Sequence, residues 1–138
     1  MLLHKDAKVE LLKQVPLFER LSKRELREIA TLADELHLPA GRHLAKEGAT
    51  GKEFVVLVEG AADVRRRGRK INTLGSGDFL GEIALITGAP RTATVTTTAG
   101  SRLLVITSSA FRRLMREMPS IQEKVLAALA ARIPDDLH

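Results

Sequence analysis

The sequence predicts one α+β domain, in which an antiparallel β-sandwich or barrel is flanked by helices at both ends of the chain. Apolar residues recur at helical spacing in residues 5–36 and again from residue 108, whereas residues 37–107 contain short β-branched runs separated by glycines. The length of 138 residues is that of one domain with a sizeable core. We therefore expect N-terminal helices in residues 1–36, strands in residues 37–107 and C-terminal helices in residues 108–138.

The N-terminal region is expected to form two helices. The apolar face of the first is made by Val9, Leu11, Leu12 and Val15. Pro16 stops this helix, because proline has no N–H and clashes with the preceding turn. The run SKRE at Ser22–Glu25 has the form of a capping box, in which the two side chains satisfy free backbone N–H groups. It predicts a second helix with an apolar stripe at Leu26, Ile29, Ala30, Leu32 and Ala33.

The central region is expected to contain the strands within HLA, EFVVLVEG, AADVRRR, KINTLG, RTATVTTT and RLLVITS. The basic run RRRGRK at Arg65–Lys70 surrounds Gly68 between two of these runs, which indicates a hairpin tip. It contributes much of the net charge of +5. We interpret it as a solvated turn, and a docking surface for an acidic partner is the alternative.

Two helices are expected after the strands. Ser108 or Ser109 caps the first, which runs through FRRLMREM to Pro119. The run SIQE at Ser120–Glu123 has the form of a second capping box and opens the last helix, which Pro134 ends.

Composition excludes several classes of protein. The chain has no cysteine, which excludes a disulfide framework and fits a reducing cytoplasm. No apolar run approaches the roughly 20 residues that a membrane helix needs, and the N-terminus has no apolar signal region. Four phenylalanines and no Trp or Tyr argue against stacking platforms for single-stranded nucleic acid. The four histidines form no ligand cluster in the sequence, so we expect no metal and no catalytic residues.

The stretch GDFLGEIALITGAPRTATV at residues 77–95 holds one glutamate and one arginine among mostly small and apolar residues. GEIALI does not alternate like a strand, so we expect one short helical turn after Gly81, with backbone N–H groups that suit an anion. Ala84 is small enough for a ligand to approach closely. The Arg91 guanidinium pairs well with two phosphate oxygens, and the Glu82 carboxylate suits a sugar hydroxyl. The stretch therefore fits a small ligand with one phosphate and one ribose hydroxyl.

This stretch resembles the phosphate-binding cassette of cyclic nucleotide-binding domains. The family pattern is Gly-Glu-apolar-Ala-Leu, a spacer, and then Arg-Ser/Thr/Ala-Ala-Thr/Ser-Val, which matches residues 81–85 and 91–95. The upstream run AGRHLAKEGATGKEFVVLVEGAADV is similar to the first half of that family's β-roll. The resemblance implies an antiparallel β-roll of jelly-roll-like form, with an N-terminal helical segment, a short cassette helix and two C-terminal helices.

The resemblance also implies roles for individual residues. Glu82 would bind the ribose 2′-hydroxyl and Arg91 the phosphate, while Thr92 and Ala93 would line the pocket. The backbone contacts would come from Gly81, Glu82, Ile83 and Ala84. Val64, and Ile71 or Leu74, would pack against the purine. The last helix closes over the base in some members of the family, and its lid candidates here are Leu126, Leu129 and Arg132.

The implied function is a regulatory sensor that binds a cyclic nucleotide without altering it and whose outer helices move on binding. We expect cAMP, the commoner ligand of the family. Thr92 leaves a cGMP-selective sensor open, because a threonine at this position can bond the guanine amino group. A partner-docking domain that no longer binds nucleotide is the remaining alternative, for which the basic hairpin would be the first surface to study.

Competing functions fit the sequence less well. GATGK at Gly48–Lys52 is not a P-loop, because its first glycine is too close to the lysine and Glu53 stands where Ser or Thr is needed. An isomerase or phosphodiesterase on a similar barrel would need a metal cluster that the histidines do not supply. The chain ends at His138 without room for a helix-turn-helix, so we expect no DNA binding by this chain alone. The effector is then a separate partner or a domain missing from this chain.

Overall fold

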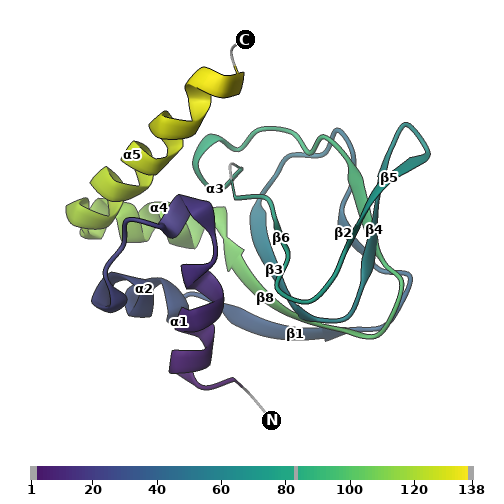
Figure 1. Cartoon of the computed structure of the whole chain (residues 1–138), viewed down its shortest axis with the longest axis horizontal. Coiled ribbons are helices and arrows are strands. Elements are labelled where there is room, and N and C mark those ends of the chain that lie inside the picture. Colours follow the sequence, from purple (N-terminus) through teal and green to yellow (C-terminus); the bar gives the residue numbers. More distant parts are fainter. Residues whose placement is uncertain (1–2, 83, 137–138) are drawn as a thin grey trace.

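The computed structural model describes residues 3–82 and 84–136, with the side chains of the last helix described as far as residue 131. Figure 1 shows a layer of helices beside a β-roll made of two sheets, with the N- and C-termini at opposite ends of the helical layer. The first sheet lies against the helices, and the second sheet faces it on the far side. This arrangement confirms the α+β class.

The N-terminal helices are α1 (Lys5–Lys13), the 3-10 turn η1 (Pro16–Phe18) and α2 (Lys23–Ala30). The first capping box is confirmed, since the Glu25 N–H donates to Ser22 Oγ and the Ser22 N–H donates to Glu25 Oε1. The helical prediction was wrong beyond Ala30. Strand β1 (Asp34–Leu38) begins four residues later and pairs with five residues of a distant strand, and this pairing overrides local helical spacing.

The strands form two antiparallel sheets of four strands each. The first has the order β1-β8-β3-β6, and its remaining members are β3 (Glu53–Glu59), β6 (Phe79–Leu80) and β8 (Ser101–Thr107). The second has the order β2-β7-β4-β5, with β2 (His43–Ala45), β4 (Ala62–Arg66), β5 (Arg69–Leu74) and β7 (Thr94–Thr97). The β-roll is therefore confirmed. Within the described residues the sheets face each other as separate layers and do not close into a barrel.

Strand β3 lies at the centre of the molecule and is covered on both faces. Phe54 and Val56 pack into the cluster that joins the first sheet to the helices. Val55 and Leu57 point the other way, into a cluster between the two sheets. Burial on both faces explains why this strand reads as a continuous apolar run rather than an alternating one.

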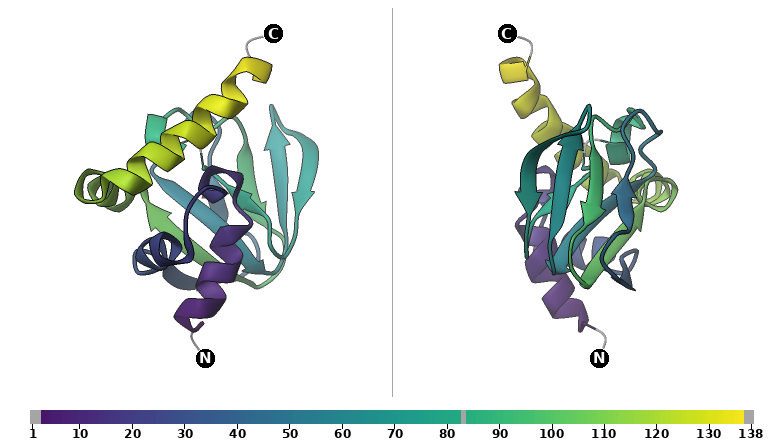
Figure 2. Two further views of the ribbon diagram at one scale, coloured as in Figure 1. Left: turned by 60° about the vertical axis from the view of Figure 1, so that its left-hand side comes forward. Right: turned by 90° about the vertical axis from the view of Figure 1, so that its right-hand side faces the viewer.

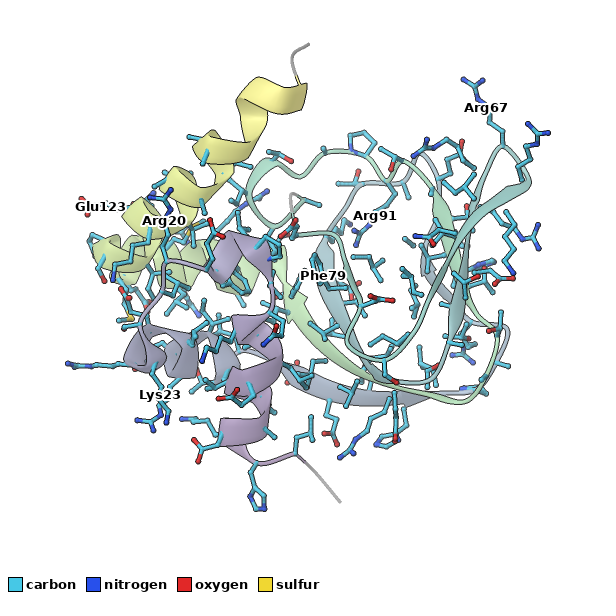
Figure 3. All side chains as sticks on the ribbon, in the orientation of Figure 1. Arg20, Lys23, Arg67, Phe79, Arg91 and Glu123 are labelled. Atoms are coloured by element: carbon cyan, nitrogen blue, oxygen red, sulfur yellow. The ribbon has the colours of Figure 1, made fainter. Side chains whose placement is uncertain are left out.

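The hairpin between β4 and β5 confirms the predicted turn. Arg67 and Gly68 occupy the tip with φ angles of 53° and 77°, the combination that a tight two-residue hairpin turn requires. All residues from Arg65 to Lys70 are exposed, and Figure 3 shows Arg67 pointing away from the molecule. Asp63 pairs with Arg65 at 3.8 Å and with Lys70 at 3.3 Å, which offsets part of the positive charge.

The C-terminal helices are α4 (Ser108–Glu117) and α5 (Pro119–Asp136), whose far end projects beyond the β-roll (Figure 2). The cap of α4 is Thr107, whose Oγ1 accepts from the Ala110 N–H, so the prediction of Ser108 or Ser109 was wrong by one or two positions. The second capping box is also wrong. Pro119 occupies the first position of α5, which suits a residue without an N–H, and Ser120 Oγ donates to Glu25 Oε2 instead.

The end predicted for α5 was wrong as well, because the helix continues through Pro134 to Asp136. A proline this close to a helix end removes one hydrogen bond from the last turns, and the helix ends two residues later.

Candidate functional site

The cassette is a sharp turn followed by a single helical turn. Gly81 follows strand β6 with a φ of 84°, in the left-handed region that favours glycine. Helix α3 (Ala84–Thr87) then forms, as the sequence predicts, with the Leu85 N–H donating to the Gly81 carbonyl at 3.3 Å. Ile83, one of the predicted backbone contacts, lies outside the described residues.

The backbone around Arg91 is held by the loop that connects β2 to β3. The Gly48 N–H donates to the Arg91 carbonyl and the Arg91 N–H donates to the Ala49 carbonyl, both at 2.8 Å. The Gly51 N–H donates to the Ala89 carbonyl at 3.2 Å, and a Cβ on Gly51 would lie 2.6 Å from that of Ala84. The stretch GATGK is therefore the backbone support of the cassette, a role that sequence reasoning missed.

The Arg91 side chain crosses over Gly81 towards strand β3. Its Nη2 donates to the backbone carbonyl of Glu53, and a Cβ on Gly81 would overlap its Nη1 atom. Burial lowers the pKa of the Arg91 guanidinium and the charge of Glu53 opposes that shift, yet the group stays protonated because an arginine pKa starts so high. The site thus holds a partly desolvated positive charge, for which an anion is the natural partner.

Arg91 faces a cavity of about 330 Å³. Figure 3 shows Arg91 inside the β-roll, and Phe79 on β6, the edge strand of the first sheet. The cavity is lined by Ala45, Val64, Asn72, Leu74, Phe79, Leu80, Gly81, Ala84, Ala89, Pro90, Arg91, Thr92, Ala93 and Val95. Its size is in the range of small-molecule sites, and its lining is mostly apolar with a few polar groups.

A row of cross-strand partners forms one wall of this cavity. Ala45 pairs with Val95, Val95 pairs with Val64, and Val64 pairs with Asn72, so the row crosses all four strands of the second sheet. All four residues line the cavity. The site therefore has a cationic end at the cassette and an apolar surface with an amide at its edge.

Most predicted site residues meet at the cavity. Gly81, Ala84, Arg91, Thr92, Ala93, Val64 and Leu74 line it. Glu82 is only 7% exposed and is not among the lining residues. Ile71, the alternative base contact, is 49% exposed and lies outside the lining. It falls at the register shift between the pairs Val64–Asn72 and Arg65–Lys70.

The lid candidates lie elsewhere. Leu126 is 43% exposed and Leu129 packs against the helical core, and neither lines the cavity. Arg132 belongs to α5, but its side chain lies beyond those that the structure describes. In this conformation the described part of α5 leaves the cavity open.

Sequence reasoning missed several lining residues: Ala45, Asn72, Phe79, Leu80, Ala89, Pro90 and Val95. Five of them fall inside the stretch 77–95, so their place in the chain was a usable signal: Phe79, Leu80, Ala89, Pro90 and Val95. Ala45 and Asn72 come from strands distant in sequence, and only the register of the second sheet brings them together.

Among the described residues, no group of three or more His, Cys, Asp or Glu side chains could hold a metal ion. None of the helices in this part of the chain has the length and apolar character needed to cross a membrane.

The fold and the cavity define a small-ligand binding module of the β-roll type, with an arginine poised for an anion. The family model described as "Cyclic nucleotide-binding domain" matches residues 35–118, and the chain belongs to this family. The described cavity lies wholly within that range.

Individual relatives have different outputs. A cAMP-dependent protein kinase regulatory subunit of Mycosarcoma maydis is 38% identical over 82% of this chain and 23% of its own length. A cyclic nucleotide-gated potassium channel of Rhizobium etli is 34% identical over 84% of this chain and 32% of its own. A solved N-terminal domain of a transcriptional regulator from Streptomyces coelicolor A3(2) superposes with a TM-score of 0.82 at 27% identity, covering 91% of this chain and 94% of that one. The chain thus spans a third or less of the length of the kinase regulatory subunit and of the potassium channel.

Proposed function

We propose that this domain is a regulatory sensor that binds cAMP in the cavity and whose C-terminal helices move on binding. The observation that carries the proposal is the polarity of the cavity, with the Arg91 guanidinium at one end and the row of Ala45, Val95 and Val64 along one wall. A cyclic phosphate suits the guanidinium, and a purine ring suits the apolar row. The kinase regulatory subunit, a relative named for cAMP, supports adenine as the base.

A cGMP-selective sensor is the second candidate, and the position of Thr92 favours it. Thr92 lines the cavity directly after Arg91 in the chain, and it is exposed. A hydroxyl that meets the guanine amino group would discriminate between the purines. Direct comparison of cAMP with cGMP decides between the two candidates.

The proposal includes binding without chemical change, so the cyclic nucleotide remains intact. The output lies with a partner protein or with another part of a longer chain. A kinase catalytic subunit is one such partner, on the basis of the regulatory-subunit relative. We also propose a cytoplasmic location, with which a chain free of cysteine is compatible.

The test is calorimetric titration with cAMP and with cGMP. Replacing Arg91 by alanine should weaken binding by roughly 2–5 kcal/mol, or about 30-fold to several thousandfold, because a partly buried charge pair is lost. The affinity of Arg91→Lys should lie between those of the wild type and Arg91→Ala, because lysine keeps the charge but lacks the paired N–H donors of the guanidinium. The nucleotide recovered after titration should still be cyclic.

Arg24→Ala is the matched control, because Arg24 is an exposed arginine on α2. It should bind as the wild type does. A folded wild type that binds neither nucleotide would overturn the proposal.

A further inference from the structure

Three of the residues that line the cavity have polar side chains: Asn72, Arg91 and Thr92. Arg91 and Thr92 belong to the cassette, where the phosphate and ribose are proposed to lie. Asn72 belongs to β5, the edge strand of the second sheet, and ends the row whose other members are Ala45, Val95 and Val64. It therefore lies where a base resting on that row would present its edge.

The register of the hairpin directs the Asn72 side chain to the cavity face. Asn72 is the direct partner of Val64, so their side chains project from the same face of the sheet. Leu74 lies two residues further along β5 and shares this face, and it lines the cavity too. Asn72 is exposed, so its amide is accessible to a ligand in the cavity.

The orientation of the Asn72 amide determines whether it offers a ligand a hydrogen-bond donor or an acceptor. Asn72 Oδ1 accepts from the Thr73 backbone N–H at 2.8 Å. Since a backbone N–H only donates, this bond holds the amide oxygen in place and leaves the Nδ2 amino group to meet the ligand. The group at the edge of the row is thus a hydrogen-bond donor, and it selects an acceptor.

We propose that Asn72 recognises the base, with Nδ2 donating to N7 of the purine. This inference rests on the proposed function and names how the same site identifies its ligand. N7 is an acceptor in both adenine and guanine, whereas the exocyclic N6 of adenine is a donor. N3 lies beside the ribose, which the cassette holds. Pyrimidines have no imidazole ring and no N7, so Asn72 selects purine cyclic nucleotides.

The test is a cycle of two ligands and two proteins: cAMP and 7-deaza-cAMP with the wild type and with Asn72→Ala. In 7-deaza-cAMP a C–H replaces N7, so the acceptor is lost while the shape is kept. The wild type should bind it about 3- to 10-fold more weakly than cAMP, as expected for one neutral hydrogen bond. Asn72→Ala should bind cAMP more weakly by a similar factor and should not distinguish the two ligands.

Two further variants sharpen the cycle. Asn72→Asp places a carboxylate opposite N7, so it should bind cAMP more weakly than Asn72→Ala does. Thr73→Ala is the control, because Thr73 lies next to Asn72 on the exposed strand, outside the cavity lining, and its backbone N–H remains. This control should discriminate between the ligands as the wild type does.

The outcomes separate the inference from the proposed function. The role of Asn72 is overturned if the wild type binds cAMP and 7-deaza-cAMP with equal affinity. It is also overturned if the ratio of the two affinities is the same in the wild type and in Asn72→Ala. In both cases the sensor function stands. If the folded wild type binds no cyclic nucleotide, the proposed function fails and the inference fails with it.

Discussion

Single glycines decide how closely the backbone of this site packs. At Gly81 a Cβ would overlap Nη1 of Arg91 and lie 2.6 Å from the carbonyl oxygen of Glu53. Both neighbours matter, because that carbonyl is the acceptor that orients the guanidinium. The absence of a side chain at Gly81 is therefore a condition for the position of Arg91.

Gly81→Ala should lose both stability and nucleotide affinity. The left-handed backbone alone costs an alanine about 1–2 kcal/mol, and the overlap forces the guanidinium from its place. We expect titration with cAMP to show a loss of affinity approaching that of Arg91→Ala, together with a lower midpoint in thermal unfolding.

Gly41→Ala is the matched control for this substitution. Gly41 has a φ of 87°, close to that of Gly81, but a Cβ there would meet nothing within 4 Å. It should lose about the same backbone energy and keep its affinity for cAMP. Equal affinities in Gly81→Ala and Gly41→Ala would contradict the link between Gly81 and the position of Arg91.

At the level of elements, some local signals predicted the structure correctly and others did not. The capping box at Ser22 and the turn at Gly68 depend on neighbouring residues, and both predictions are confirmed. Strand β1 was missed because its formation depends on pairing with β8, some 60 to 70 residues further along the chain. The second capping box failed because Ser120 has a distant partner in Glu25.

The same reasoning explains which part of the cavity was predictable. Arg91, Gly81 and Ala84 lie in one continuous stretch of the sequence, so a linear pattern finds them. Asn72 lies on a different strand and depends on the register that pairs β5 with β4 and β4 with β7. A linear pattern contains no information on that register.

Glu25 is the contact that joins the second and last helices. Its carboxylate accepts from Lys124 Nζ at 2.6 Å, from Ser120 Oγ at 2.8 Å and from the Ser22 N–H at 2.8 Å. Burial raises the pKa of Glu25, but these hydrogen bonds outweigh burial and lower it from 4.5 to about 2. The first turns of α5 are thus tied to the start of α2 by a carboxylate that stays charged.

Glu25→Gln should destabilise the folded protein at neutral pH by about 1–3 kcal/mol, because hydrogen bonds to a charged group are lost in a buried place. A carboxyl with a lowered folded pKa contributes stability above its unfolded pKa and loses it as pH falls through the folded value. The contribution of Glu25 is therefore present above pH 4.5 and disappears as pH falls towards 2.

Urea unfolding of wild type and Glu25→Gln across this pH range measures the effect. The difference in unfolding free energy between the two proteins should shrink from pH 5 towards pH 2. Taking the difference removes the contribution of Glu35, whose pKa is also lowered, by contacts with Leu3 and Arg102 that outweigh its burial. Glu123→Gln, an exposed site on α5, should match the wild type. A difference that does not change with pH would contradict the role of Glu25.

Across the whole molecule, the four phenylalanines form a continuous chain from the cavity to the C-terminal helices. Phe79 lines the cavity and contacts Phe54, with ring centroids 6.0 Å apart. Phe54 contacts Phe18 at 5.9 Å, and Phe18 contacts Phe111 of α4 at 5.7 Å. A ligand that moves Phe79 therefore acts on the packing of α4 through closely packed rings, which resist continuous deformation.

The series of contacting phenylalanines predicts that cAMP changes hydrogen exchange in residues 108–133. A ligand shifts the position of the helices only by its different affinity for their arrangements, so the change should scale with occupancy of the cavity. The ion pair between Glu25 and Lys124 holds the start of α5. The largest change in hydrogen exchange is therefore expected in α4 and in the later turns of α5. Phe18→Leu leaves the cavity lining intact but removes one ring from the series of contacting phenylalanines. This variant should bind cAMP, while the change in hydrogen exchange in α4 becomes smaller. Exchange in this segment that is identical with and without saturating cAMP would show that the helices do not respond to the ligand.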